Sequence, residues 1–380
     1  MVTPLGDTDE TWERLLTSAC AARSWPDLED EGFPISVACR VSHVSSTDPR
    51  RRGRDLASRA VAQALQAADV DLANIEPERR AVFVGTTMGE SAGYELAAGS
   101  SSPFSIDDAA GQVFGRHIAG EIGAQGPARV YGTACAAGNY ALGAAAEMVR
   151  AGSVDVAIAG GVEPFSRIAL LGFSRMRAMT PDRCRPFVAG RRGMQLGEAA
   201  AFVVVESEEC AERRGAIVRA QIGALGLASD AHHPTAPRAD GSGMAAAMKA
   251  GLRCTGIRAD DVDWVSAHGT GTPQSDAAEA KALHQVFGPT VPPVSSVKGA
   301  IGHAMGAAAA VESVIAIRVL EAQLVPPNVN GDEPDPALGL DVVTTPRSAS
   351  LQWVMNCAYA FGGLNSALLI GSPAAPWESG

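Results

Sequence analysis

Residues 129–159 read RVYGTACAAGNYALGAAAEMVRAGSVDVAIA, and this stretch decides the fold class. It begins with a β-rich segment, Arg129 to Ala134, which leads into a turn of small residues. The Ala-rich segment Tyr140 to Arg150 predicts a helix, and Gly152 follows it as a typical residue just beyond a helix end. The apolar run Val154 to Ala159 predicts a second strand. Strand, tight turn, helix and strand in succession indicate an α/β fold.

The same alternation continues through the rest of the chain. Further buried strands are predicted at Ala81–Gly85, Ala201–Glu206 and Val262–Ala267. After a strand from Val294, the segment Ser295-Ser-Val-Lys-Gly299 is expected to lead into a helix that runs to about Leu320. A chain of 380 residues is too long for one simple core. The two parts look alike in plan, so we expect an N-terminal half of residues 1–218 and a C-terminal half of residues 219–380.

Composition and charge exclude several classes of function. The formal net charge is -11, which disfavours a nucleic acid partner because the surface would repel phosphate. The longest apolar run, Ala304 to Ile317, is interrupted by Glu312 and is shorter than the roughly 18 to 20 residues of a membrane span. We therefore expect no membrane partner. The first residues do not resemble a signal peptide, so we expect a cytoplasmic protein.

The cysteines predict neither a disulfide framework nor a metal site. There are seven, widely scattered, with no Cys-x-x-Cys pair and no histidine at ligand spacing beside them. Most are expected to be small buried side chains in a reducing compartment.

Cys135 has different surroundings, because it lies in Gly132-Thr-Ala-Cys-Ala-Ala-Gly138 between a predicted strand and a predicted helix. Small neighbours leave the sulfur uncovered, and the positive end of the helix dipole favours the thiolate. This setting suits a nucleophile. The alternative is a buried cysteine chosen for its size at a tight crossing.

Two histidines follow predicted strands in the same way. His268 lies in Ala267-His-Gly-Thr-Gly-Thr-Pro273, where Thr270 and Thr272 supply hydroxyl groups. The ends of strands are where α/β sheets bind ligands, which favours a functional role over a structural one. Lys298-Gly-Ala-Ile-Gly-His303 is a third strand-to-helix passage. By itself it is equally consistent with a solvated lysine beside a histidine that caps a helix.

Taken together, these segments resemble the β-ketoacyl synthase family, and most closely the elongating type II synthases of bacteria. The resemblance rests on Thr133-Ala-Cys-Ala-Ala-Gly138, His268-Gly-Thr-Gly-Thr-Pro-Gln-Ser-Asp276, Lys298-Gly-Ala-Ile-Gly-His-Ala-Met-Gly306 and Ala360-Phe-Gly-Gly363. Arg183 to Phe187, Gly197-Glu198 and Ser229 to Pro237 extend it. The resemblance implies a thiolase-like α/β fold of five layers, αβαβα, built from two similar halves.

The resemblance also implies a mechanism. Cys135 would accept an acyl chain as a thioester. Neutral His268 and His303 would hold the carbonyl of a malonyl thioester, so that loss of carbon dioxide leaves a stabilised enolate. Lys298 would orient His303 and keep it uncharged. Backbone N–H groups of Cys135 and Phe361 would form the oxyanion hole.

Substrates and partners follow from the same resemblance. Thr270 and Thr272 would bind a phosphopantetheine arm, and Phe361 would gate the acyl pocket. No bound cofactor and no metal are expected, because acyl carrier protein delivers the substrates. The chain would form a homodimer or a heterodimer with a homologous subunit. The basic run Arg50 to Arg54 is either a docking site for the carrier or solvated surface.

Several features depart from the family pattern. In the family a first core strand usually precedes the segment that corresponds to Val2-Thr-Pro-Leu-Gly6. This strand is missing from the sequence, so we expect an altered sheet edge. Val188 stands where aspartate is usual, and Ala309 replaces a frequent glycine. The capping region between Gly89 and Gly126 is short. This shortness favours specialised-metabolite biosynthesis over housekeeping lipid synthesis.

Four other functions differ from this one in the residues that they require. A thiolase would need a second reactive cysteine in a Cys-x-Gly setting, which Cys357-Ala-Tyr does not supply. The priming type of synthase pairs cysteine and histidine with asparagine instead of a second histidine. A non-catalytic partner subunit of a ketosynthase should lack the nucleophile. A non-decarboxylating thioester acyltransferase stays open, because Cys135 and an oxyanion hole would suffice.

Overall fold

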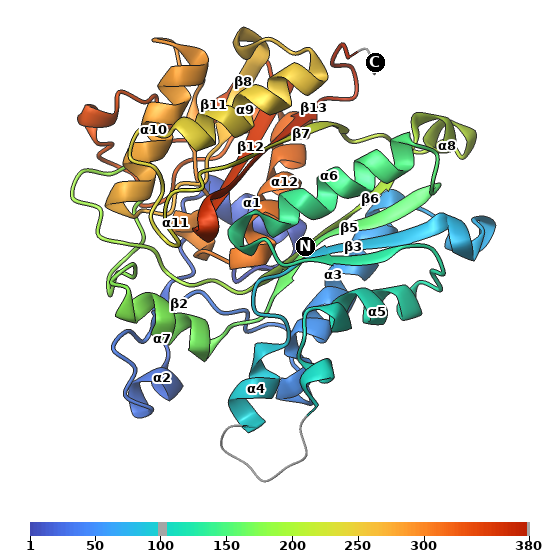
Figure 1. Cartoon of the computed structure of the whole chain (residues 1–380), viewed down its shortest axis with the longest axis horizontal. Helices are drawn as coiled ribbons and strands as arrows, with labels where there is room; N and C mark the ends of the chain where they lie inside the picture. Colours follow the sequence, from blue (N-terminus) through green and yellow to red (C-terminus); the bar gives the residue numbers. More distant parts are fainter. Residues whose placement is uncertain (98–104, 378–380) are drawn as a thin grey trace.

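The computed structural model describes residues 1–97 and 105–377, and its helices and strands form five layers (Figure 1). Helices α3 (Arg52–Ala68) and α5 (Gln112–Glu121) cover the outer face of the first sheet. Helices α6 (Ala137–Arg150) and α12 (Met305–Ala322) lie between the two sheets, and α9 (Ser242–Thr255) covers the second sheet with α10 (Pro273–Phe287) beside it. The predicted five-layer αβαβα fold is confirmed.

The first sheet has the strand order β4-β3-β5-β6. Strands β3, β4 and β5 are parallel, and β6 is antiparallel to β5. Their bounds are Arg80–Gly85 for β3, Ala128–Tyr131 for β4, Val156–Glu163 for β5 and Ala199–Glu206 for β6.

The second sheet has five strands in the order β7-β13-β12-β8-β9. Strands β8, β9 and β12 are parallel, whereas β13 runs antiparallel to both of its neighbours. The bounds are Gln221–Ser229 for β7, Val262–Ser266 for β8, Val294–Ser295 for β9, Trp353–Ala360 for β12 and Leu364–Gly371 for β13. The first sheet is built before the predicted boundary at residue 218 and the second after it.

Shorter elements complete the fold. The helices are α1 (Thr8–Leu16), α2 (Pro26–Asp30), α4 (Ser91–Ala97), α7 (Arg167–Arg175), α8 (Glu208–Arg213) and α11 (Lys298–Ile301). The strands are β1 (Arg23–Ser24), β2 (Val37–Ala38), β10 (Leu324–Val325) and β11 (Arg347–Ser348). In Figure 1, α2, α4 and α7 lie together at one end of the molecule, away from α9 and α10.

The helix predicted to run to about Leu320 is present as α12, and the passage that leads into it contains a separate short helix, α11. The two helices α11 and α12 are separate, because Gly302 has a φ of 72° and Met305 a φ of 38°. A left-handed residue cannot continue a right-handed helix. The break leaves His303 outside both helices, where its backbone pairs with Gln195 and Gly197 instead.

The central layer is packed through small residues. A Cβ atom on Gly138 of α6 would lie 2.5 Å from the backbone nitrogen of Ala310 on α12. Only a glycine permits such a close approach of two helix backbones. Among the described residues, no helix is both long and apolar enough to cross a bilayer, although α12 is almost wholly buried.

We expect Gly138→Ala to lower the free energy of unfolding by about 1–3 kcal/mol, because the added methyl group overpacks the contact between α6 and α12. The matched control is Gly172→Ala in α7, where an added Cβ meets nothing within 4 Å. This change should raise stability by about 0.5–1 kcal/mol, since glycine loses more backbone entropy on folding. Urea unfolding of both variants measures the difference, and equal effects would contradict the packing argument.

Candidate active site

Cys135 lies at the junction of β4 and α6. Strand β4 ends at Tyr131, and a 3-10 turn over Ala134–Ala136 leads into α6. Ala134 has a φ of 47°, a left-handed conformation that costs a non-glycine residue about 1–2 kcal/mol. The turn presents the Cys135 side chain at the N-terminal end of α6, where it is 8% exposed.

The loop that carries His268 follows β8 and is held by two buried carboxylates. Glu279 accepts hydrogen bonds from the backbone nitrogens of His268 and Gly269, at 2.8 and 2.9 Å. Asp276 accepts one from Gly271, at 3.1 Å. Both acids lie on α10, which begins directly after the loop. The helix therefore fixes the position of the imidazole through the backbone of the loop.

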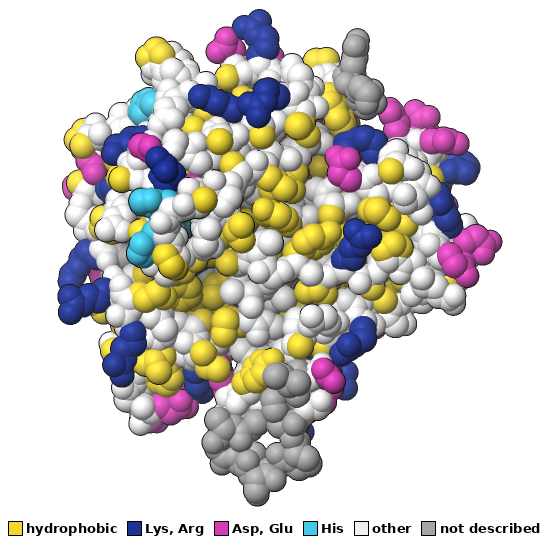
Figure 2. Space-filling view, viewed as in Figure 1, with side chains coloured by type: hydrophobic (Ala, Val, Ile, Leu, Met, Phe, Trp, Pro, Cys, Tyr) yellow, Lys and Arg dark blue, Asp and Glu magenta, His cyan; other side chains and the backbone are white. Residues whose placement is uncertain are grey.

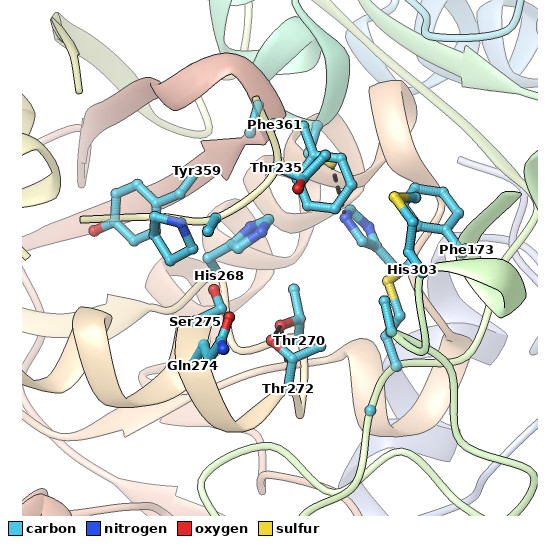
Figure 3. A pocket seen from close by; sticks show the side chains of 18 of the residues that line it. Phe173, Thr235, His268, Thr270, Thr272, Gln274, Ser275, His303, Tyr359 and Phe361 are labelled. Carbon is cyan, nitrogen blue, oxygen red and sulfur yellow. Dashed lines mark hydrogen bonds between the residues drawn. The ribbon is translucent and has the colours of Figure 1, made fainter. Parts of the chain in front are cut away.

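The structure brings Cys135, His268 and His303 together. His303 Nε2 lies 3.1 Å from Cys135 Sγ. The two imidazole rings are 5.4 Å apart between centroids and nearly perpendicular, at 84°. The ring of Tyr359 packs against His268 on the other side, with centroids 5.6 Å apart. Figure 3 shows the two histidines side by side with Phe361 close above. Both histidines are almost completely buried, at 3% and 2% exposure.

These side chains line a cavity of about 360 Å³. Thr270 and Thr272 also line it, with their hydroxyl oxygens 2.9 Å apart. Phe361 follows β12 and packs its ring against Phe173 of α7, with centroids 5.6 Å apart. Phe361 is 36% exposed, so this aromatic pair forms part of the cavity's mouth. In Figure 3 the threonines lie across the cavity from Phe361.

Burial and a nearby cation keep the histidines neutral. Burial lowers the pKa of both His268 and His303 well below its ordinary value, and the charge of Lys298 lowers it further. Lys298 is itself 1% exposed, and its ammonium group pairs with Glu312 of α12. Burial raises the pKa of Glu312 to about 7, against the opposing effect of Lys298. Lys298 therefore acts on His303 through its charge, while its hydrogen bond goes to Glu312.

The expectation that the helix terminus makes Cys135 a thiolate needs correction. Burial raises the pKa of Cys135 to about 12, and Lys298 only partly opposes this shift. The loss of hydration outweighs the favourable end of the helix. The resting form is therefore a thiol, and His303 Nε2 is the adjacent group that could accept its proton.

Three buried carboxylates that support the site were not predicted from the sequence. Two of them are Glu279, which holds the loop of His268, and Glu312, which pairs with Lys298. Glu163, at the end of β5, accepts hydrogen bonds from the backbone nitrogens of Thr87, Met88 and Gly306. It thus joins the first sheet to the start of α12, just after His303. An acidic residue within an otherwise apolar strand or Ala-rich helix was the available signal, since such a side chain is rarely buried without a partner.

Two of the four arginines in the basic run Arg50 to Arg54 are structural, whereas Arg50 and Arg51 are exposed. Arg52 pairs with the buried carboxylate of Glu198, at 2.8 Å, and Arg54 pairs with Glu90, at 3.4 Å. The predictions of a carrier-docking site and of solvated surface are therefore both wrong for Arg52 and Arg54, because each guanidinium neutralises a buried acid. The capping region between Gly89 and Gly126 lies partly outside the described residues, at positions 98–104.

Val188 and Ala309, the two residues that depart from the family pattern, are both buried. Val188 is 7% exposed and its backbone bridges to Pro334. Ala309 packs with Ala136 and Ala358, beside the turn that carries the cysteine. Nothing here defines a metal centre, since the described residues contain no group of three or more side chains placed to hold an ion.

A buried thiol beside neutral imidazoles, in a cavity that opens to the surface, is the arrangement of an enzyme that forms a covalent intermediate on a cysteine. Comparison with known proteins gives the family. Residues 1–211 match the model of the β-ketoacyl synthase N-terminal domain, and residues 219–332 match that of the C-terminal domain. The chain belongs to the β-ketoacyl synthase family.

The relatives cover nearly the whole chain. A 3-oxoacyl-[acyl-carrier-protein] synthase 2 of Rhizobium meliloti (strain 1021) is 34% identical over 97% of this chain and 96% of its own length. The solved ishigamide ketosynthase/chain length factor is 33% identical with a TM-score of 0.91, covering 98% of this chain and 96% of the other. A type II PKS ketosynthase, solved in complex with its acyl-carrier protein, is 27% identical with a TM-score of 0.90, covering 98% and 97%.

Variants at Lys298 should separate its effect on stability, through Glu312, from its effect on the pKa of the two histidines. We expect Lys298→Met to cost about 3–5 kcal/mol of stability, because Glu312 is left buried without its cation. The double variant Lys298→Met/Glu312→Leu should recover most of this loss. In both variants the pKa of His268 and His303 should rise toward the ordinary value, so the two imidazoles protonate at higher pH and activity is lost earlier on acidification. Urea unfolding and an NMR titration of the histidines measure the two effects. An unchanged histidine pKa would show that the charge of Lys298 does not govern protonation.

Proposed function

We propose that this protein is an elongating β-ketoacyl synthase that joins an acyl thioester to a malonyl-type thioester by decarboxylative Claisen condensation. The observation that carries the proposal is the contact of 3.1 Å between Cys135 Sγ and His303 Nε2, with His268 beside them in one buried cavity. Membership of the family supports the same activity.

The first half-reaction loads the acyl chain. The Cys135 thiol passes its proton to His303 Nε2, and the sulfur attacks the acyl thioester carbonyl. The carrier thiolate leaves and takes the proton from His303, so the imidazole is neutral again. Backbone N–H groups of Cys135 and Phe361 form the oxyanion hole for the tetrahedral intermediate. One such donor typically contributes on the order of 3 kcal/mol.

The second half-reaction forms the carbon–carbon bond. Neutral His268 and His303 each donate an N–H to the thioester carbonyl of the malonyl unit. Carbon dioxide leaves, and the electron pair of the broken bond becomes an enolate stabilised by these donors. The enolate carbon attacks the acyl thioester on Cys135, the carbon–sulfur bond breaks, and the departing thiolate takes up one proton from solvent, which the net reaction consumes. Lys298 is a positioning residue in this scheme, because its charge keeps both donors neutral.

Acyl carrier protein would deliver both substrates. Thr270 and Thr272 line the cavity below the histidines and would bind the phosphopantetheine arm by their hydroxyl groups. Phe361 stands at the mouth against Phe173 and would move when the acyl chain enters. The scheme uses no cofactor other than the arm that carries each substrate, and no metal ion. The carrier complex of the related type II PKS ketosynthase supports this partner.

We also infer that the chain pairs with a second ketosynthase-like subunit, either another copy or a homologue. Large apolar side chains are exposed at Leu96 of α4 and at Ile168 and Leu171 of α7, two helices that pack together. In Figure 2 apolar side chains also gather across the middle of the face shown, with charged side chains mainly at its rim. The ketosynthase/chain length factor relative supports a heterodimer.

The setting we propose is fatty-acid or polyketide-type biosynthesis in the cytoplasm, with specialised metabolism favoured. All seven cysteines are free, as expected in a reducing compartment. A non-decarboxylating thioester acyltransferase is the second candidate, because Cys135 and the oxyanion hole alone could transfer an acyl group to another nucleophile. A silent partner subunit is disfavoured by the nucleophile and its paired imidazole.

Intact mass of the protein after incubation with acyl-carrier thioester should show one added acyl group, followed by carbon dioxide release when malonyl-carrier thioester is supplied. Cys135→Ala should abolish the adduct, whereas Cys254→Ala, which removes an exposed thiol, should keep it. His268→Ala should load the acyl group but release carbon dioxide about 100- to 1,000-fold more slowly, because it loses one enolate donor. His303→Ala should slow both steps.

Three outcomes would change the assignment. An adduct on Cys135 without carbon dioxide release in the wild-type protein would favour the acyltransferase. A wild-type protein that takes up no acyl group would remove both enzymatic functions. Equal slowing of loading by the two histidine variants would contradict the separate roles given to His268 and His303.

A further inference from the structure

Two arginines line the surface end of the active-site cavity without a partner of their own. Arg177 and Arg192 belong to the lining of the cavity that contains Cys135, and both are exposed, whereas the cysteine is buried. Among the described residues, neither side chain forms an ion pair or a hydrogen bond. Arg177 also has a φ of 56°, a left-handed conformation that is unfavourable for a residue with a side chain. The cavity therefore leads from the sulfur to two uncompensated positive charges.

The backbone brings these two arginines to the same end of two neighbouring segments. Met179 and Met194 form a parallel bridge, with a backbone hydrogen bond of 2.9 Å on either side. Arg177 and Arg192 each stand two residues before this bridge. Gly193 donates a backbone hydrogen bond of 3.0 Å to the turn that carries the two cavity threonines. The arginines therefore lie beside the part of the cavity that is proposed to bind a pantetheine arm.

The acids close to the two arginines are already engaged. Among the described residues, Asp230 is the one acid in the cavity lining. Its carboxylate accepts hydrogen bonds from Asn365 Nδ2, at 2.7 Å, and from the backbone nitrogen of Arg238, at 3.0 Å. Asp182, which lies between the two arginines in the sequence, pairs with Arg185 at 3.1 Å. The two like charges at the mouth therefore repel one another, and an anion bound between them would relieve this repulsion.

A diphosphate has the chemistry that two adjacent guanidinium groups recognise. Each guanidinium can donate a pair of hydrogen bonds to one phosphate group. On a carrier protein the pantetheine arm ends in a single phosphodiester, whereas in coenzyme A it ends in a diphosphate that is joined to a nucleotide. Two arginines at the mouth match the two phosphate groups of coenzyme A, while the same cavity leads the arm past the threonines to the cysteine.

Building on the loading step of the proposed function, we propose that Arg177 and Arg192 bind the diphosphate group of coenzyme A, so that acyl-coenzyme A thioesters load Cys135 directly. The cysteine sulfur attacks the acyl carbonyl, and the bond between the acyl carbon and the sulfur of coenzyme A breaks. The thiol proton passes by way of His303 to the departing sulfur. The products are the acyl-enzyme and free coenzyme A. This route supplies the first acyl group, while the malonyl unit still arrives on its carrier.

The test compares three hexanoyl thioesters, those of coenzyme A, 4′-phosphopantetheine and pantetheine, which end in a diphosphate, in one phosphate and in no phosphate. Intact mass of the full-length protein at successive times gives the rate constant for acylation of Cys135 by each. Loading from coenzyme A should be at least about tenfold faster than loading from the other two. A rise in ionic strength should remove most of this advantage, because both arginines are exposed.

Arg177→Gln and Arg192→Gln should each reduce the rate ratio of coenzyme A to pantetheine about fivefold or more. Arg253→Gln is the matched control, because Arg253 on α9 is also exposed and has no partner among the described residues, but lies outside the cavity lining. It should keep the ratio. Both rates of a ratio come from one protein preparation, so a partly unfolded variant does not imitate the effect.

The outcomes separate this inference from the proposed function. Equal loading from coenzyme A and pantetheine would overturn the inference alone. Equal loading from coenzyme A and phosphopantetheine would assign the arginines to the single phosphate of a carrier arm, and so would overturn it as well. Failure of all three thioesters, with normal loading from a carrier protein, has the same consequence. Failure of the carrier thioester too would contradict the proposed ketosynthase together with the inference.

Discussion

The close approach of α6 to α12 is the constraint on which the rest of the structure depends. Cys135 stands just before α6 and His303 just before α12, so the separation of the two helices sets the separation of sulfur and imidazole. Gly138 lets the backbones touch at this point, and a Cβ on Gly161 of β5 would meet Ala307 of α12 at 2.9 Å. The small residues of the central layer thus serve the chemistry as well as the packing.

Dehydration of the site follows from the same packing and determines its electrostatics. Removing water favours uncharged imidazoles, as the condensation requires, but it also favours an uncharged thiol. Lys298 is a cation whose charge acts on all three groups, and its pairing with Glu312 allows it to remain buried. Two further buried acids, Glu163 and Glu279, bind backbone N–H groups and so hold the loops that carry the site.

Much of the fold and the reactive groups could be predicted from the sequence, because both depend on local patterns. Strands such as Ala81–Gly85 and turns such as the one at Cys135 are determined by residues that are adjacent in the sequence. The break between α11 and α12 could not be predicted in this way, since Gly302 and Met305 take left-handed conformations only where their neighbours in the fold hold them. The raised pKa of Cys135 and the pairing of Lys298 with Glu312 depend on burial, which no local pattern reveals.

The burial of the Lys298–Glu312 pair has a consequence for how the protein responds to its medium. Dissolved ions weaken interactions between exposed charges but scarcely enter a dry interior. The field that Lys298 exerts on the histidines is thus insulated from changes in ionic strength, whereas an encounter with a charged carrier at the surface is not. The reaction therefore takes place in a region of low dielectric constant inside the protein, whereas the encounter with the carrier takes place at the hydrated surface.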